Sequence, residues 1–199
     1  VEGNGRTAIN GVAEAIGTGT KADMAYCYEI IWRVNDQIYV TDGTKDDTFT
    51  LSGGAGTTKG QFTEDNDKGI TGDIEAFYPA SLMTADGYVW PATQTNNQVA
   101  PMYAKQSISG VGDETVNFSS LGAMLQIAFS TTASDITVTS IVLKDENKPL
   151  SGKFTVTDGQ AIMAENAANP GVMLNLGESG VPVGVAATYF YLAIPAGDY

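Results

Sequence analysis

Short apolar runs, separated by glycine-rich turns, constrain this chain more than any other feature of its sequence. The runs are rich in aromatic and β-branched residues, as in QIYV, TFTL and YVW, whereas TDGTKDD and SGGAGTTKG separate them. Charged residues make up only 17% of the chain, below the roughly 25% of an average protein. Such a chain is predicted to be all-β with many turns.

One segment alternates strictly between two faces. Its alternating apolar residues are Leu121, Ala123, Leu125, Ile127 and Phe129. A period of two predicts a β-strand with one packed face. Leu121, Met124, Leu125 and Ala128 also fit helical spacing, so a helix remains the alternative.

The run from Tyr189 to Ile194 is apolar on both faces, and the sequence stops five residues later. A strand of this composition is normally covered on both sides. Its partner is therefore expected either in this chain, in residues beyond the sequence, or in another copy.

The remaining pattern indicates strands at the spacing of a β-sandwich. A short helix at Val12–Ile16 and a helical turn within residues 160–171 are alternatives, and a bulge near Thr139–Ser140 would restore the alternation of residues 135–145. A polar stretch between Gln106 and Glu114 suggests two domains, 1–110 and 111–199. The first begins with a flexible or extended lead-in of about twenty residues.

Net charge and residue types exclude several functions. The formal charge is −13 and no basic patch is visible, so nucleic acid and anionic membranes are unsuitable partners. The chain has no histidine, which removes the commonest general base and metal ligand. Its one cysteine, Cys27, is expected to be a buried, inert thiol. No membrane span, metal or cofactor is predicted, and no enzymatic activity.

Two groups of side chains have alternative explanations. Asp65, Asp67 and Gly69 have the spacing of part of a calcium loop, but Lys68 intrudes, and a solvated turn is favoured. Aromatic residues could form a sugar-stacking platform, although core and rim positions are favoured: Trp32, Trp90, Tyr78, Tyr88 and Tyr103.

Arg6 and Arg33 are the only arginines. Arg33 follows Trp32 in an expected strand, whereas Arg6 lies in the Gly/Asn/Thr-rich stretch GNGRTAIN. A trypsin-like protease could reach Arg6 there. The alternative is an incidental residue of the tail.

Several stretches together resemble the fimbrillin-like family of Bacteroides-type surface fimbriae, the type V pilus subunits. They occur in the family's order: WRVNDQIYV, AFYPAS, WPATQT, MYA, FSSLGAMLQIAF, SIVLKDENKPLSGKFTVT and FYLAIPAGDY. Ser120 stands where the family usually has histidine. The likeness covers about residues 7–199.

The resemblance implies two consecutive β-sandwich domains of transthyretin-like or Greek-key type. It implies a structural subunit of a cell-surface fimbria, exported through the outer membrane as a lipoprotein precursor and involved in cell adhesion. An arginine-specific protease would remove an N-terminal segment by cutting after Arg6, and subunits would then join head to tail by β-strand donation. Family members continue after PAG-x-Y, so the second domain is expected to be truncated here.

The competing hypotheses make different predictions. The fimbrial hypothesis predicts an N-terminal strand that is packed in the core groove and released at Arg6, with other subunits and a host or bacterial surface receptor as partners. A non-catalytic glycan-binding surface module predicts an exposed aromatic patch. A glycosidase, the least favoured class, predicts a cleft with two facing carboxylates.

Overall fold

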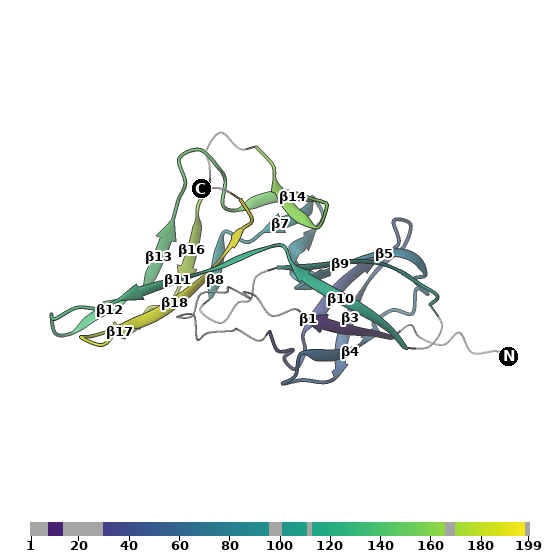
Figure 1. Cartoon of the computed structure of the whole chain (residues 1–199), viewed down its shortest axis with the longest axis horizontal. Coiled ribbons are helices and arrows are strands. Elements are labelled where there is room, and N and C mark those ends of the chain that lie inside the picture. The colour runs from purple at the N-terminus through teal and green to yellow at the C-terminus, as the bar shows by residue number, and fades with distance from the viewer. Residues whose placement is uncertain (1–7, 14–29, 96–100, 111–112, 166–169, 198–199) are drawn as a thin grey trace, which may run out of the picture. The chain divides into compact units, whose positions relative to one another are not determined.

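The computed structural model describes residues 8–13, 30–95, 101–110, 113–165 and 170–197. Within these ranges the chain forms eighteen β-strands and a single three-residue 3-10 helix, η1 (Ala80–Leu82) (Figure 1). The predicted all-β fold class is confirmed. The described residues contain no helix capable of spanning a membrane.

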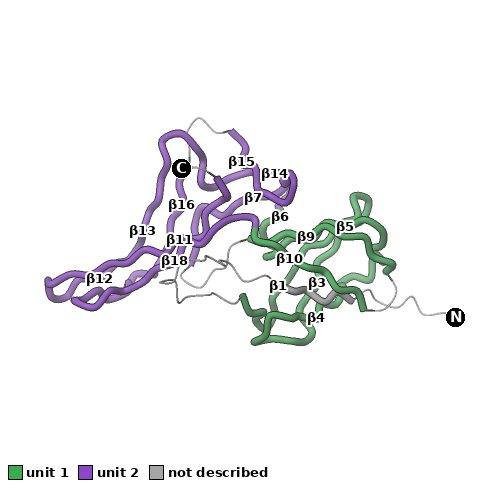
Figure 2. The backbone as a smooth tube through the Cα atoms, in the orientation of Figure 1, with its two compact units in different colours: residues 1–83, 101–120 green, residues 84–100, 121–199 purple. Residues whose placement is uncertain are grey.

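The chain divides into two compact units (Figure 2). Unit 1 comprises residues 1–83 and 101–120, and unit 2 comprises residues 84–100 and 121–199. The boundary expected at residues 110 and 111 falls between β9 (Met102–Ile108) and β10 (Asp113–Ser120), both of which belong to unit 1.

Unit 1 is a barrel whose strand order closes on itself, β1-β10-β9-β5-β2-β3-β4. Besides β9 and β10, its strands are β1 (Ala8–Ala13), β2 (Gln37–Thr41), β3 (Asp46–Gly53), β4 (Lys59–Glu64) and β5 (Gly72–Tyr78). All neighbouring pairs are antiparallel except β1 with β10, which is parallel.

Alternation along these strands creates the barrel core. In β2, for example, Ile38 and Val40 are fully buried while the residues between and beside them are partly or fully exposed. The same period of two places Phe49 of β3 and Phe62 of β4 inside. The core of unit 1 therefore follows directly from the sequence pattern.

Unit 2 consists of four small sheets. Their orders are β15-β14-β7-β6, β13-β16-β8, β11-β18 and β12-β17. The strands are β6 (Met83–Thr84, at the unit boundary), β7 (Gly87–Trp90), β8 (Thr93–Thr95), β11 (Gly122–Phe129), β12 (Ile136–Val138), β13 (Ser140–Leu143), β14 (Gly152–Thr157), β15 (Gln160–Met163), β16 (Val172–Asn175), β17 (Val181–Val183) and β18 (Thr188–Pro195).

The apolar run near the end of the chain finds its partner within unit 2. β18 pairs antiparallel with β11 over eight residues, from Thr188 with Phe129 to Pro195 with Gly122. Phe190 and Leu192 are fully buried in a core cluster that they share with Leu150, Val172, Leu174 and Val183. The alternating segment 121–129 is thus a strand, and the helical alternative is wrong.

A side chain pairs with the second edge of β18. The Gln94 amide donates from Nε2 to the Ala193 carbonyl oxygen at 2.7 Å, and the Ala193 N–H donates to Gln94 Oε1 at 2.9 Å. Gln94 is almost completely buried, so this two-point contact satisfies backbone groups that water does not reach.

Neither expected helix is present among the described residues, and residues 166–169 of the second lie outside the described part of the chain. Val12 and Ala13 belong to β1, and residues 14–16 lie outside the described part of the chain. Residues 160–163 form β15, which follows β14 through a tight turn with positive φ at Asp158 and Gly159. Asp-Gly is a strong hairpin signal, and it outweighed the alanine-rich, helix-like composition that follows.

Residues 8–13 of the expected lead-in are extended and are paired on both edges. The bulge predicted near Thr139–Ser140 is instead a break between two strands: β12 ends at Val138 and pairs with β17, and β13 begins at Ser140 and pairs with β16.

Proline in β1 tests whether this strand is integral to unit 1. β1 is paired with β4 on one edge and with β10 on the other. Proline has no N–H, so Asn10→Pro removes a ladder hydrogen bond whichever of these strands the Asn10 N–H faces. We expect unit 1 to lose roughly 1–3 kcal/mol. Each unit has one tryptophan, so fluorescence in a Trp90→Phe background follows Trp32 and unit 1 during urea unfolding.

The control is the same Asn10→Pro change in a Trp32→Phe background, where Trp90 reports unit 2 and its transition should not move. An unchanged unit 1 transition would show that β1 contributes nothing to the barrel.

Candidate functional site

The first candidate site is the slot that β1 occupies, which we call the β1 slot and define as the facing edges of β4 and β10. β1 runs parallel to β10 from Ala8 opposite Asp113 to Ala13 opposite Phe118. It runs antiparallel to β4 over five residue pairs. Figure 1 shows β1 beside these two strands. One strand therefore closes the barrel.

The walls of the slot are apolar on the core side. Phe62 of β4 and Val116 and Phe118 of β10 are fully buried, and Gly60 is buried as well. Every second residue of β1 is in register with one or two of these four positions. Without β1, the slot would present unpaired backbone groups above an apolar floor.

β10 depends on β1 more than on its other neighbour. Six residues of β10 are in register with β1, whereas only Ser119 and Ser120 are in register with β9. Loss of β1 would leave the segment 113–118 with little ladder pairing, so we expect β1 and β10 to loosen together.

Trp32 links the two walls of the slot from inside the barrel. Its ring lies edge-on to Phe62 at 4.9 Å and to Phe118 at 5.8 Å between centroids. Its Nε1–H donates to the Thr58 carbonyl oxygen at 3.1 Å, and only 1% of the residue is exposed. Edge-to-face packing with a satisfied polar tip is favourable for a buried indole.

Gly60 permits this arrangement. A Cβ atom at this position would lie 2.7 Å from Leu51 Cδ1, 2.8 Å from Phe62 Cε2 and 2.9 Å from Trp32 Cδ1. No side chain fits without moving these groups. Sequence reasoning missed Gly60, because nothing in the local pattern distinguishes it from the turn glycines before it.

Arg6, the predicted cleavage site, lies outside the described residues. β1 begins at Ala8, on the C-terminal side of Arg6. A cut after Arg6 would release residues 1–6 and leave β1 joined to the rest of the chain. The strand that occupies the slot is therefore not the segment that such a cut removes.

Arg33 has an exposed side chain but a constrained backbone. Its N–H donates to Asp36 Oδ2 at 2.6 Å, and its carbonyl accepts from the Asp36 N–H at 3.0 Å. The preceding Trp32 is bonded through its own N–H and C=O to Thr57 and Gly56. A protease that binds extended substrates should cut poorly in this closed turn.

Tyr78, in β5 of the barrel, contacts the turn formed by residues 33–36. Its hydroxyl donates to Asp36 Oδ1 at 3.0 Å, and its ring packs edge-on to Trp32 at 5.1 Å. Burial, with the nearby Asp36 carboxylate, raises the pKa of Tyr78 well above its ordinary value. The tyrosinate form is therefore disfavoured in the folded state.

The acidic cluster at residues 64–69 is organised by its own backbone. The buried Glu64 accepts from the N–H groups of Lys68 at 2.7 Å and Gly69 at 3.3 Å. The buried Asp47 accepts from the Asn66 N–H at 2.8 Å. Within the described ranges no three acidic or cysteine side chains gather as metal ligands. The favoured interpretation, a turn, fits these contacts.

The five aromatic residues do not gather as the alternative, a sugar-stacking platform, requires. Trp32, Trp90, Tyr78 and Tyr103 are each at most 8% exposed, which confirms the favoured core positions. Tyr88, the fifth, is only half-buried and lines a groove. Trp90 Nε1 is a buried N–H without a hydrogen-bond partner in the part of the chain that the structure describes. Cys27 lies outside that part.

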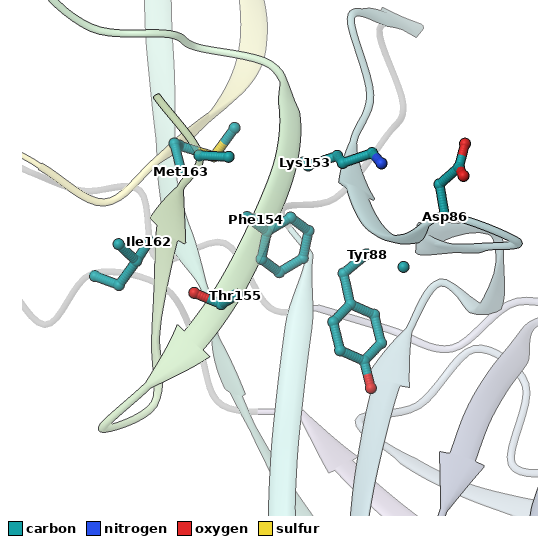
Figure 3. Close-up of a pocket in the computed structure, with 9 residues that line it drawn as sticks. Asp86, Tyr88, Lys153, Phe154, Thr155, Ile162 and Met163 are labelled. Atoms are coloured by element: carbon teal, nitrogen blue, oxygen red, sulfur yellow. The ribbon is translucent and has the colours of Figure 1, made fainter. Parts of the chain in front are cut away.

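The groove beside Tyr88 is the second candidate site. It lies within unit 2 and has a volume of about 470 Å³. Its lining comes from the start of β7, from β14 and from β15 and includes Asp86, Tyr88, Lys153, Phe154 and Ile162 (Figure 3). A neighbouring hollow of about 330 Å³ shares Ile162 and Met163 and adds Lys148 and Glu165.

Comparison with known proteins adds evidence on the fold. No family model matches the chain, and no curated protein matches it. A solved structure described as a putative cell adhesion protein from Bacteroides ovatus is similar at 15% identity and a TM-score of 0.50. The match covers 96% of this chain and 78% of the other. At this identity the likeness extends to the fold alone.

Gly60→Ala tests the packing against the slot. The new methyl must displace Leu51, Phe62 or Trp32, so we expect unit 1 to lose roughly 1–3 kcal/mol through overpacking. Urea unfolding followed by Trp32 fluorescence in the Trp90→Phe background measures this. The control is Gly184→Ala in unit 2, where a Cβ would meet nothing within 4 Å; Trp90 fluorescence in the Trp32→Phe background should show an unchanged unit 2 transition. An unchanged unit 1 transition in Gly60→Ala would refute tight packing at Gly60.

Tyr78→Phe tests the linkage between ionisation and folding. Because its pKa is raised on folding, Tyr78 contributes stability that is complete below pH 10 and is lost as the pH rises above that value. Unfolding midpoints of unit 1 at pH 8 to 11 should fall less steeply in Tyr78→Phe than in the parent. Parallel pH profiles would contradict the raised pKa.

Proposed function

We propose that this protein is a structural subunit of a bacterial surface fimbria that takes part in cell adhesion. Subunits would assemble by β-strand donation after proteolytic removal of an N-terminal segment. The observation that carries this proposal is the β1 slot, where a single strand, β1, closes the barrel between β4 and β10.

Strand donation follows from the chemistry of the slot. An emptied slot exposes N–H and C=O groups of both flanking strands above Phe62, Val116 and Phe118. A strand from a neighbouring subunit satisfies the backbone groups and covers the apolar floor with alternate side chains. Because such a head-to-tail contact does not close on itself, repetition gives a filament.

Cleavage after Arg6 would act on β1 indirectly. The new N-terminus, Thr7, directly precedes β1, so β1 becomes the terminal strand of the chain. It can then leave the slot without drawing residues 1–6 through the barrel. In this scheme the cut enables withdrawal of β1, and the incoming strand completes it.

The fold comparison also supports a role at the cell surface. The similar solved structure is described as a putative cell adhesion protein, and its source, Bacteroides ovatus, fits a Bacteroides-type surface protein. Export as a lipoprotein precursor, other fimbrial subunits as partners, and a host or bacterial surface receptor belong to the same proposal.

The glycosidase alternative is not favoured by either groove of unit 2. Asp86 is the one carboxylate among the residues that line the larger groove, and Glu165 is the one in the smaller. Hydrolysis with two carboxylates requires a facing pair.

Limited digestion of the full chain with an arginine-specific protease tests the proposal. We expect one early cut after Arg6, because the Arg33 backbone is held in its turn. The cut should convert the monomer into a ladder of oligomers or fibres, observed by intact mass, size-exclusion chromatography and electron microscopy.

Two conservative variants are the controls. Arg6→Lys keeps the charge but resists the protease, and it should stay monomeric. Arg33→Lys should be cut and assemble like the parent. A stable monomer after complete cutting at Arg6 would overturn the proposal.

A further inference from the structure

The groove beside Tyr88 has the dimensions of a ligand site. Its volume of about 470 Å³ lies within the roughly 300–1,000 Å³ of small-molecule sites in proteins. Three hydrogen-bonded strands supply its walls, since β14 pairs with β7 on one side and with β15 on the other. Groups on paired strands hold fixed positions, as a binding site requires.

The floor of the groove is apolar and partly aromatic. The Tyr88 and Phe154 rings lie 5.9 Å apart at an interplanar angle of 33°, and Phe154 is buried. Met163, opposite Phe154 in the β14–β15 register, extends the floor. Phe154 rests in turn on Trp90 at 6.1 Å, so the Tyr88 ring sits on a supported aromatic base.

The rim is polar and electrically balanced. Asp86, Lys153 and Thr155 are exposed, and they supply a carboxylate, an ammonium and a hydroxyl group. In Figure 3, Phe154 lies between Asp86, Tyr88 and Lys153 on one side and Ile162 and Thr155 on the other. The two charges cancel, although the whole chain carries −13.

This combination defines the class of ligand. With one carboxylate and one ammonium, the rim gives neither a cation nor an anion a net electrostatic attraction, whereas hydroxyl groups can donate to the carboxylate and accept from the ammonium. A sugar ring presents such hydroxyl groups around an apolar C–H face, which suits the aromatic floor. We propose that this groove binds a short, neutral saccharide, with Tyr88 as its stacking residue.

The proposal is independent of strand exchange, because every residue of the groove belongs to unit 2, whereas the β1 slot belongs to unit 1. The test therefore uses the uncut monomer. Its failure would leave assembly after Arg6 cleavage untouched.

Saturation-transfer NMR and calorimetry with the full chain give the test. The probes are neutral trisaccharides of glucose, galactose and mannose, beside a trisaccharide that carries a uronate. We expect at least one neutral probe to bind and the acidic probe to bind no better. Tyr88→Ala should weaken binding at least tenfold, and Tyr88→Phe, which keeps the ring, should lose less than threefold.

Two further variants complete the design. Tyr189→Ala removes an exposed tyrosine of unit 2 that does not line the groove, and binding should not change. Asp86→Asn keeps hydrogen bonding without the charge and should change affinity less than threefold. The proposal is overturned if no neutral probe binds at millimolar concentration, if Tyr88→Ala binds normally, or if only the uronate binds.

Discussion

Pairing of β1 on both of its edges is the interaction on which unit 1 depends. The first strand of the chain joins β4, about fifty residues away in sequence, to β10, about a hundred residues away. Closing contacts of such separation costs chain entropy, which the pairing and packing of β1 must offset. A strand whose partners are both distant in sequence can be replaced by a strand from another copy without breaking local contacts.

The backbone groups at strand edges are satisfied differently in the two units. In unit 1 the edges of β4 and β10 are satisfied by a strand, and Trp32 and Gly60 allow the walls to pack closely behind it. In unit 2 the second edge of β18 meets the Gln94 amide at Ala193. The Gln94 side chain already bonds the Ala193 N–H and C=O, so these groups are not available to pair with an added strand. Exchange is therefore expected at the β1 slot.

Alternation along the chain was sufficient to predict the all-β fold and individual strands such as β2, β3 and β11. The residue pattern did not locate β1, because Ala8–Ala13 has a weak strand composition and its partners are two distant strands; an N-terminal strand in the core groove was expected only from the family resemblance. β15 was missed because four residues are too few to show a period. The contact of Gly60 with Trp32, and the gathering of Asp86, Tyr88 and Lys153, depend on strand register, which no local pattern of residues encodes.

Hydrogen–deuterium exchange of the dilute monomer, before and after cleavage at Arg6, tests the central claim most directly. The account predicts that the cut speeds exchange in β1 and in residues 113–118 of β10 together, while the paired strands β2 and β3 keep their protection. Unchanged protection of β1 and β10 after complete cleavage would contradict it, because β1 would then be a permanent part of the barrel and not an exchangeable strand.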